Sequence, residues 1–159
     1  MSKSEELDVI EEAKQQYIVV TLGGEHYGID ISFVDNIVRL SSITRVPKAP
    51  AHYKGVINLR GEVVPVMSIR MKMGLEDDQF TNSTRIIILK LEELGYLGII
   101  VDSVNEVVSL GESDIDRNVS NMKETKGNFI NGIGKDGDRL ISIFDIDKVA
   151  GESTKDKEK

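Results

Sequence analysis

Short apolar runs that alternate with polar positions dominate the chain from about residue 16 to about residue 145, and glycines or turn residues end most of them. β-branched residues are frequent within the runs, and such side chains fit the pleated surface of a strand. Each run is about as long as an average strand of 5–6 residues. The pattern therefore predicts strands at 16–22, 25–30, 35–40, 54–59, 62–67, 85–91, 96–101, 104–109, 128–134 and 138–143.

Turn and helix signals punctuate these runs. Gly23-Gly24, Arg60-Gly61 and Asp136-Gly137 supply residues that tolerate positive φ at hairpin turns. Pro65 has no amide hydrogen, so its strand should lie at a sheet edge or leave that amide side unpaired. Short helices are expected at 68–73 and at 144–149. The first is closed by Gly74, and Ser68 is available as its N-cap.

The first half of the pattern recurs in the second half. The segment Gly28–Val38 matches Gly98–Val108, 70 residues later, and each copy follows an apolar run, 17–20 and 87–90. A second match places Gly55–Met67 beside Gly132–Ile143, with Gly61 aligned to Gly137. A duplication explains both matches better than a chance likeness between β-rich segments.

Five short strands bury little surface as an open sheet, whereas closing the sheet removes its exposed edges. The prediction is therefore an all-β protein of two tandem five-stranded barrels, the first at 16–80 and the second at 81–150, with short helical turns. A barrel this small is marginal alone, so the two should pack together and leave a groove at their seam. Residues 1–15 are expected to be a flexible segment and residues 151–159 a disordered tail.

Composition narrows the classes of function. The net charge of −7 opposes binding to nucleic acid, because that affinity depends on cations that displace counterions from phosphates. Cysteine is absent, which excludes disulfides and thiolate chemistry. No run of about 18 apolar residues and no signal peptide is present, so we expect a cytoplasmic protein that does not insert into a membrane.

A search for catalytic or ligand-binding chemistry finds little. The only histidines, His26 and His52, are interpreted as surface or packing residues. Gly132-Ile133-Gly134 runs into a hairpin rather than a helix, so it does not form a phosphate-binding loop. Asp136–Asp138 and Glu76–Asp78 lack calcium-loop spacing and are interpreted as a turn and a solvated linker. We therefore predict no catalytic residue, cofactor or metal, and interpret the chain as a binding module.

The segment Lys54-Gly55-Val56-Ile57-Asn58-Leu59-Arg60-Gly61-Glu62-Val63-Val64-Pro65-Val66 resembles the signature of the CheW family of chemotaxis adaptors. Supporting pieces are Tyr27–Ile31, Ile43–Pro50, Val101–Val104 and the last hairpin with its helix, from Gly132 to Val149. The resemblance extends from about Gln16 to Val149. It implies two five-stranded barrels that resemble SH3 domains, in agreement with the duplication.

The resemblance also implies a function without catalysis. A member of this family couples the cytoplasmic tips of chemoreceptors to the histidine kinase CheA. It binds the kinase through its regulatory domain and helps to build receptor–kinase arrays at the membrane. The alternative is a small ligand-binding or enzymatic tandem barrel that uses the cleft between the barrels, which would need convergent polar groups of perturbed pKa.

The resemblance assigns partner-binding roles to several residues. Arg60 lies in the family's Asn-Leu-Arg-Gly turn and is expected to function in complex formation, the alternative being a solvated hairpin arginine. Asn58 and Gly61 belong to the same turn, where Asn58 could also serve only as a brace. An apolar groove for the receptor helix is expected at Val34, Ile37, Val38, Val104 and Val107, although these could equally fill barrel cores.

Two positions depart from the family's pattern. Asn36 stands where the family commonly carries Glu, which puts the polar receptor contact there in doubt. Ser68 replaces a common Asp after the Pro65 strand.

Overall fold

The computed structural model describes residues 12–118 and 129–151. All ten predicted strands form within these residues, and a two-residue strand is added at 115–116. The strands are β1 (Lys14–Leu22), β2 (Glu25–Asp30), β3 (Val34–Arg39), β4 (Tyr53–Leu59), β5 (Glu62–Ser68), β6 (Arg85–Leu91), β7 (Gly95–Val101), β8 (Ser103–Gly111), β9 (Ile115–Asp116), β10 (Ile130–Asp136) and β11 (Arg139–Phe144). The helical elements are η1 (Ile31–Phe33), α2 (Ile69–Lys72), η2 (Glu112–Asp114) and a helix at 146–151.

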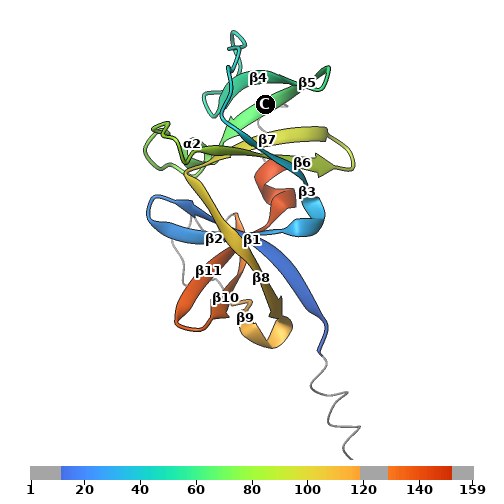
Figure 1. Cartoon of the computed structure of the whole chain (residues 1–159), viewed down its shortest axis with the longest axis vertical. Coiled ribbons are helices and arrows are strands. Elements are labelled where there is room, and N and C mark those ends of the chain that lie inside the picture. The colour runs from blue at the N-terminus through green and yellow to red at the C-terminus, as the bar shows by residue number, and fades with distance from the viewer. Residues whose placement is uncertain (1–11, 119–128, 152–159) are drawn as a thin grey trace, which may run out of the picture.

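The strands form two sheets, which confirms the predicted all-β fold. Sheet A has the order β8-β1-β2-β11-β10-β9, and sheet B has the order β3-β6-β7-β5-β4. Figure 1 shows sheet B above sheet A, with the helix at 146–151 between them. Each sheet curls on itself, because the chain that follows one edge strand reaches the opposite edge. Thr44, after β3, bridges to Val56 of β4, and β9, after β8, pairs with β10.

The strand pairing differs in one respect from the predicted division into one barrel at 16–80 and another at 81–150. The β1–β2 hairpin of the first half pairs with β8 and β11 in sheet A, and the β6–β7 hairpin of the second half pairs with β3 and β5 in sheet B. Each sheet therefore contains strands from both halves. The physical reason lies in the connections: η1 carries the chain from β2 into sheet B, and Asp102 alone separates β7 from β8 in sheet A.

The two copies match strand for strand, with small shifts from the alignment made on sequence. The β1–β2 hairpin has two residues between Leu22 and Glu25, whereas the β6–β7 hairpin has three between Leu91 and Gly95. Ile18 therefore corresponds to Ile87. The β4–β5 and β10–β11 turns both have two residues. The first residue is Arg60 in the β4–β5 turn and Gly137 in the β10–β11 turn. Arg60, not Gly61, is the counterpart of Gly137.

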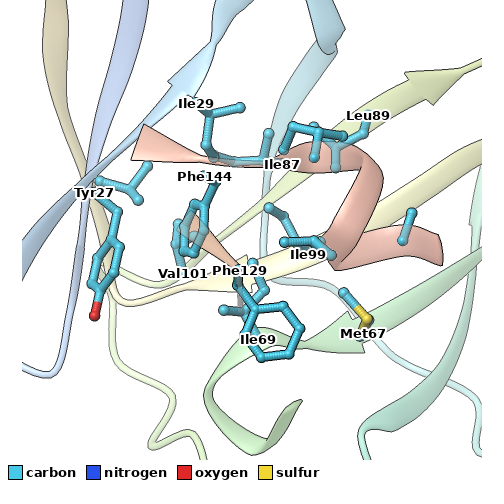
Figure 2. Close-up of a cluster of buried hydrophobic side chains, with 14 of the residues drawn as sticks. Tyr27, Ile29, Met67, Ile69, Ile87, Leu89, Ile99, Val101, Phe129 and Phe144 are labelled. Atoms are coloured by element: carbon cyan, nitrogen blue, oxygen red, sulfur yellow. The ribbon is translucent and has the colours of Figure 1, made fainter. Parts of the chain in front are cut away.

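A core between the sheets holds the molecule together. Ile18, Val20 and Leu22 of β1 share one buried cluster with Ile87 and Leu89 of β6. Figure 2 shows this cluster, in which Tyr27 and Phe144 stack with ring centroids 4.8 Å apart. Each fully buried side chain of this size contributes about 1.5–3 kcal/mol of transfer free energy.

The same strands also bury their other face. Tyr17 and Val19 of β1 lie in a second core inside sheet A, and Ile86 and Ile88 of β6 lie in a third core inside sheet B. Alternation along a strand places successive side chains on opposite faces. Strands β1 and β6 are therefore apolar on both sides, which explains their continuous hydrophobic runs.

Local signals act as the sequence predicts. The Ser68 hydroxyl accepts a hydrogen bond from Met71 N at 3.1 Å, which caps α2, and Gly74 ends the turn with φ of 79°. β5 is an interior strand, but its ladder to β7 begins only at Val66. The amide side of Pro65 is therefore left unpaired rather than placed at an edge. The segment at 76–83, which connects α2 to β6, is held to the end of β5 by one hydrogen bond: Ser68 Oγ donates to Asp78 Oδ2 at 2.5 Å.

Asp102 fixes the crossing from sheet B to sheet A. Its carboxylate accepts hydrogen bonds from Arg70 Nε at 3.0 Å, from Arg70 Nη2 at 2.6 Å and from Gly23 N at 3.0 Å. Burial would raise the pKa of this carboxyl, but the hydrogen bonds and the Arg70 charge outweigh burial, and the pKa lies below its usual value. The ion pair thus connects α2, the β1–β2 turn and the β7–β8 crossing.

The expectations for the two ends of the chain fall mostly outside the described residues, which leave out 1–11 and 152–159. Within the described part, Lys14 and Gln15 already belong to β1, and residue 151 is still helical. Among the described residues, no helix is long and apolar enough to span a bilayer.

Gly55→Ala should lower the free energy of unfolding by about 3 kcal/mol or more. Gly55 has φ of 141°, and an added Cβ would lie 2.1 Å from the Thr44 carbonyl oxygen, which would break the bridge that closes sheet B. Gly137→Ala is the control, because its φ of 65° is strained but no atom lies within 4 Å. Denaturant titration measures both, and equal losses would contradict the steric explanation.

Lowering the pH should destabilise the protein partly through Asp102. Because its folded pKa is depressed, its contribution is complete above the unfolded value of about 3.9 and is lost as the pH falls from there through the folded pKa. Asp102→Asn should make the melting temperature depend less on pH below about 4. Asp138→Asn, in an exposed turn, is the control. A slope unchanged by Asp102→Asn would show that this ion pair does not contribute.

Candidate functional site

Arg60 stands at the tip of the β4–β5 hairpin in an unusual backbone conformation. Its φ is 51° and that of Gly61 is 85°, as in a type I′ turn. A non-glycine residue in this left-handed region costs about 1–2 kcal/mol. The corresponding position in the second copy is Gly137, with φ of 65°, which avoids that cost. The first copy therefore retains an arginine where glycine would be less strained.

The Arg60 side chain projects into solvent. It is 66% exposed, and its Nη2 lies 3.2 Å from Asp35 Oδ2 on β3. Such an exposed ion pair contributes about 0–1 kcal/mol. Arg60, Asp35, Leu59, Glu62 and Tyr96 line a hollow of about 300 Å³, which we call the Arg60 hollow. Asp35 was not among the residues predicted from the sequence, although it is next to Asn36 in the chain.

The other members of the turn have local roles. Asn58 Oδ1 accepts a hydrogen bond from Gly61 N at 3.2 Å, so Asn58 braces the turn. Asn36 is not bonded to Arg60; its Oδ1 accepts a hydrogen bond from Ile37 N at 2.8 Å. The acidic partner of Arg60 is therefore one residue earlier in the chain than the position where the family commonly carries Glu.

Four of the five predicted groove residues lie on the faces of their strands that are turned toward the core between the sheets. Val34 and Val104 are half-buried against the core between the sheets, although they come from different copies. Ile37 lies opposite Ile87 and is 36% exposed, and Val107 lies opposite Ile18 and is 48% exposed. Both Ile87 and Ile18 belong to that core. Directly paired residues lie on one face of a sheet. We call Val34, Ile37, Val104 and Val107 the seam surface.

Val38 does not join the seam surface. It packs against the core inside sheet B, with Ile86 and Ile88. A bulge between Val34 and Asn36 changes which residues of β3 face inward. The seam itself is filled by the core between the sheets, so the predicted cleft is limited to the exposed edges of β3 and β8.

A smaller cavity of about 180 Å³ lies beside sheet A and is lined by Tyr17, Asp30 and Asp145 among others. Two of its carboxylates, those of Asp30 and Asp145, already have local partners. Asp30 Oδ1 accepts from Gln15 Nε2 at 2.7 Å, and Asp145 Oδ1 accepts from Lys148 N at 3.2 Å at the start of the last helix. Burial is the main cause that raises the pKa of the Tyr17 hydroxyl. These residues serve the fold, and no three acidic or histidine side chains of the described chain could together hold a metal ion.

The comparison with known proteins agrees with this geometry. The model of the CheW-like domain matches residues 16–153. The chain is 33% identical over 135 residues to the chemotaxis protein CheW of Klebsiella aerogenes, covering 85% of this chain and 81% of that protein. It is 34% identical over 135 residues to CheW of Bacillus subtilis, covering 85% and 86%.

A solved structure shows the same fold. The crystal structure of the scaffolding protein CheW from Thermoanaerobacter tengcongensis matches with a TM-score of 0.76 and 32% identity, over 83% of this chain and 89% of that chain. The resemblance inferred from the Asn58–Gly61 turn is thereby confirmed. This chain belongs to the CheW family of chemotaxis scaffolding proteins.

Proposed function

We propose that this chain is an adaptor that couples the cytoplasmic tips of chemoreceptors to the histidine kinase CheA. It binds the regulatory domain of CheA, helps to build receptor–kinase arrays, and acts in the cytoplasm after recruitment to the membrane-associated receptors. It catalyses no reaction of its own. Membership of the CheW family supports the proposal, as does the presence of two distinct exposed surfaces.

The strained, exposed Arg60 is the observation that carries the proposal. Its backbone conformation costs stability, and its weak ion pair with Asp35 does not offset that cost. Strained residues cluster at functional sites. A guanidinium keeps its charge and offers a rigid fork of donors to carboxylates or carbonyls. Arg60 is therefore best explained by binding a partner across the Arg60 hollow.

The seam surface is suited to a helix. An amphipathic helix buries its apolar face through residues spaced at i, i+3, i+4 and i+7. The seam surface offers apolar contacts along two edge strands of different sheets: Val34 and Ile37 on β3, and Val104 and Val107 on β8. We assign the receptor tip to this surface. Val34 of the seam surface precedes Asp35, the ion-pair partner of Arg60, on β3. A partner bound at one surface can therefore change the free energy with which the other partner binds.

Arg60→Gly should raise the free energy of unfolding by about 1 kcal/mol relative to Arg60→Ala. Both variants remove the side chain, but only glycine relieves the positive φ. Thermal or denaturant unfolding measures the difference. If the two variants were equally stable, the strain at this turn would be smaller than the geometry implies.

Arg60→Ala should weaken assembly with CheA and a receptor-tip fragment by about tenfold or more, equivalent to about 1.4 kcal/mol. Its melting temperature should change little, because the side chain is exposed. Lys135→Ala removes an exposed cation from the β10–β11 hairpin and is the matched control. Co-sedimentation of the three components is the measurement, and normal assembly of Arg60→Ala would disprove the role of this arginine.

The seam surface is tested in the same assay. Val107→Asp should reduce binding of the receptor fragment by about tenfold or more, because it places a charge on an apolar contact surface. Leu94→Asp, at the equally exposed β6–β7 turn, should leave binding unchanged. Equal effects of the two changes would show that the receptor does not bind at the seam.

A further inference from the structure

Two arginines face each other at one end of the seam surface. Arg39 of β3 and Arg85 of β6 are direct partners in the antiparallel ladder, next to the pair Ile37 and Ile87. Alternate residues of a strand share a face, so both arginines lie on the face that carries Ile37. Ile87 on that face belongs to the core between the sheets. The pair therefore extends the seam surface beyond its apolar part.

The charges of this pair are not neutralised within the described part of the chain. Arg85 Nη1 donates only to the carbonyl oxygens of Asn82, at 2.8 Å, and Thr84, at 2.9 Å, and no ion pair is formed by the exposed Arg39. Like charges directly opposite each other destabilise a sheet. By contrast, each of four other arginines forms an ion pair with a carboxylate: Arg60, Arg70, Arg117 and Arg139.

The corresponding place in sheet A is neutral. Val107 lies opposite Ile18, as Ile37 lies opposite Ile87, and two positions further along each ladder Ser109 lies opposite Gln16. The duplicated fold thus presents two equivalent ends of the seam, one with two cations and one with none. Stability does not explain this difference, since the arginine pair is the less favourable arrangement.

We propose that Arg39 and Arg85 form a carboxylate anchor that binds an acidic residue at one end of the receptor helix. The inference rests on the proposed function, because the helix is the partner assigned to the seam surface. Guanidinium groups bind carboxylates through two parallel hydrogen bonds, which fix orientation as well as adding affinity. An anchor at one end only determines which way the helix lies across the two sheets.

The chemistry of the surface favours an acidic helix over an anionic membrane. Lipid binding through charge alone needs several clustered cations, with each contributing about 1 kcal/mol. Here two arginines adjoin apolar Ile37, on a chain whose net charge is −7. An apolar strip with a cationic end matches an amphipathic helix that carries Glu or Asp beside its apolar face.

The test uses the full chain and a chemoreceptor-tip fragment, with affinity measured by fluorescence anisotropy at low and high salt. The double variant Arg39→Glu with Arg85→Glu should bind at least about tenfold more weakly at low salt, and less so at high salt. The control variant, Ser109→Glu with Gln16→Glu, should change affinity less than about twofold. Changing the anchored acidic residue of the fragment to Lys should restore binding to the first variant.

Circular dichroism melts keep the result interpretable, because two facing glutamates replace two facing arginines, so the like-charge repulsion is retained and the melting temperature should change little. Unaltered binding by the arginine variant, with the wild type still binding, would overturn the anchor and leave the adaptor function standing. Failure of the wild type to bind any receptor fragment would instead contradict the proposed function. Binding to vesicles that contain phosphatidylserine is measured as well. Arginine-dependent binding to them, with unchanged receptor binding, would also overturn the anchor.

Discussion

Burial of the central strands on both faces is the constraint on which the structure depends. β1 and β6 each contribute alternate side chains to the core between the sheets and to the core of their own sheet. Such strands cannot be separated from either neighbour without exposing apolar surface to water. The exchange of the β1–β2 and β6–β7 hairpins between the two halves adds backbone ladders to this packing. The two barrels therefore form one interlocked body, and its exposed edges are held in fixed positions.

The duplication supplies a symmetric framework, and the differences between the copies supply the specific surfaces. The first copy has Arg60 where the second has Gly137, and it has Arg39 where the second has Ser109. In each case the first copy accepts a less favourable local arrangement, a positive φ or a pair of like charges. Proteins retain such features when they serve a function. The differences between the copies therefore mark candidate binding surfaces.

Much of the fold could be predicted from the sequence, because glycine turns and alternating side chains act locally. The strands, the Ser68 cap and the duplication belong to this class. The exchange of the β1–β2 and β6–β7 hairpins could not be predicted, since the pattern shows that Val34 and Ile37 lie on one strand but not which strand pairs with it. The three-residue turn at 92–94 shifted the alignment of the copies by one position.

The candidate site shows the same limit. The Arg60 turn was predicted from the residues that form it, and its tight geometry depends on the same residues. Val38 packs into the sheet B core because of a bulge in β3. Asp35 meets Arg60 because closure of the barrel brings together residues that are distant in sequence. Arg39 and Arg85 likewise face each other only because β6 of the second half pairs with β3 of the first.

The central claim is that one helical partner contacts both edge strands, β3 and β8, at once. Amide chemical shifts of the isotope-labelled chain, followed during titration with a receptor-tip fragment, test it most directly. The largest changes are expected together in β3 and in the first half of β8, with the outer hairpins little affected. Changes confined to one of these strands, or to the opposite face of the molecule, would contradict it.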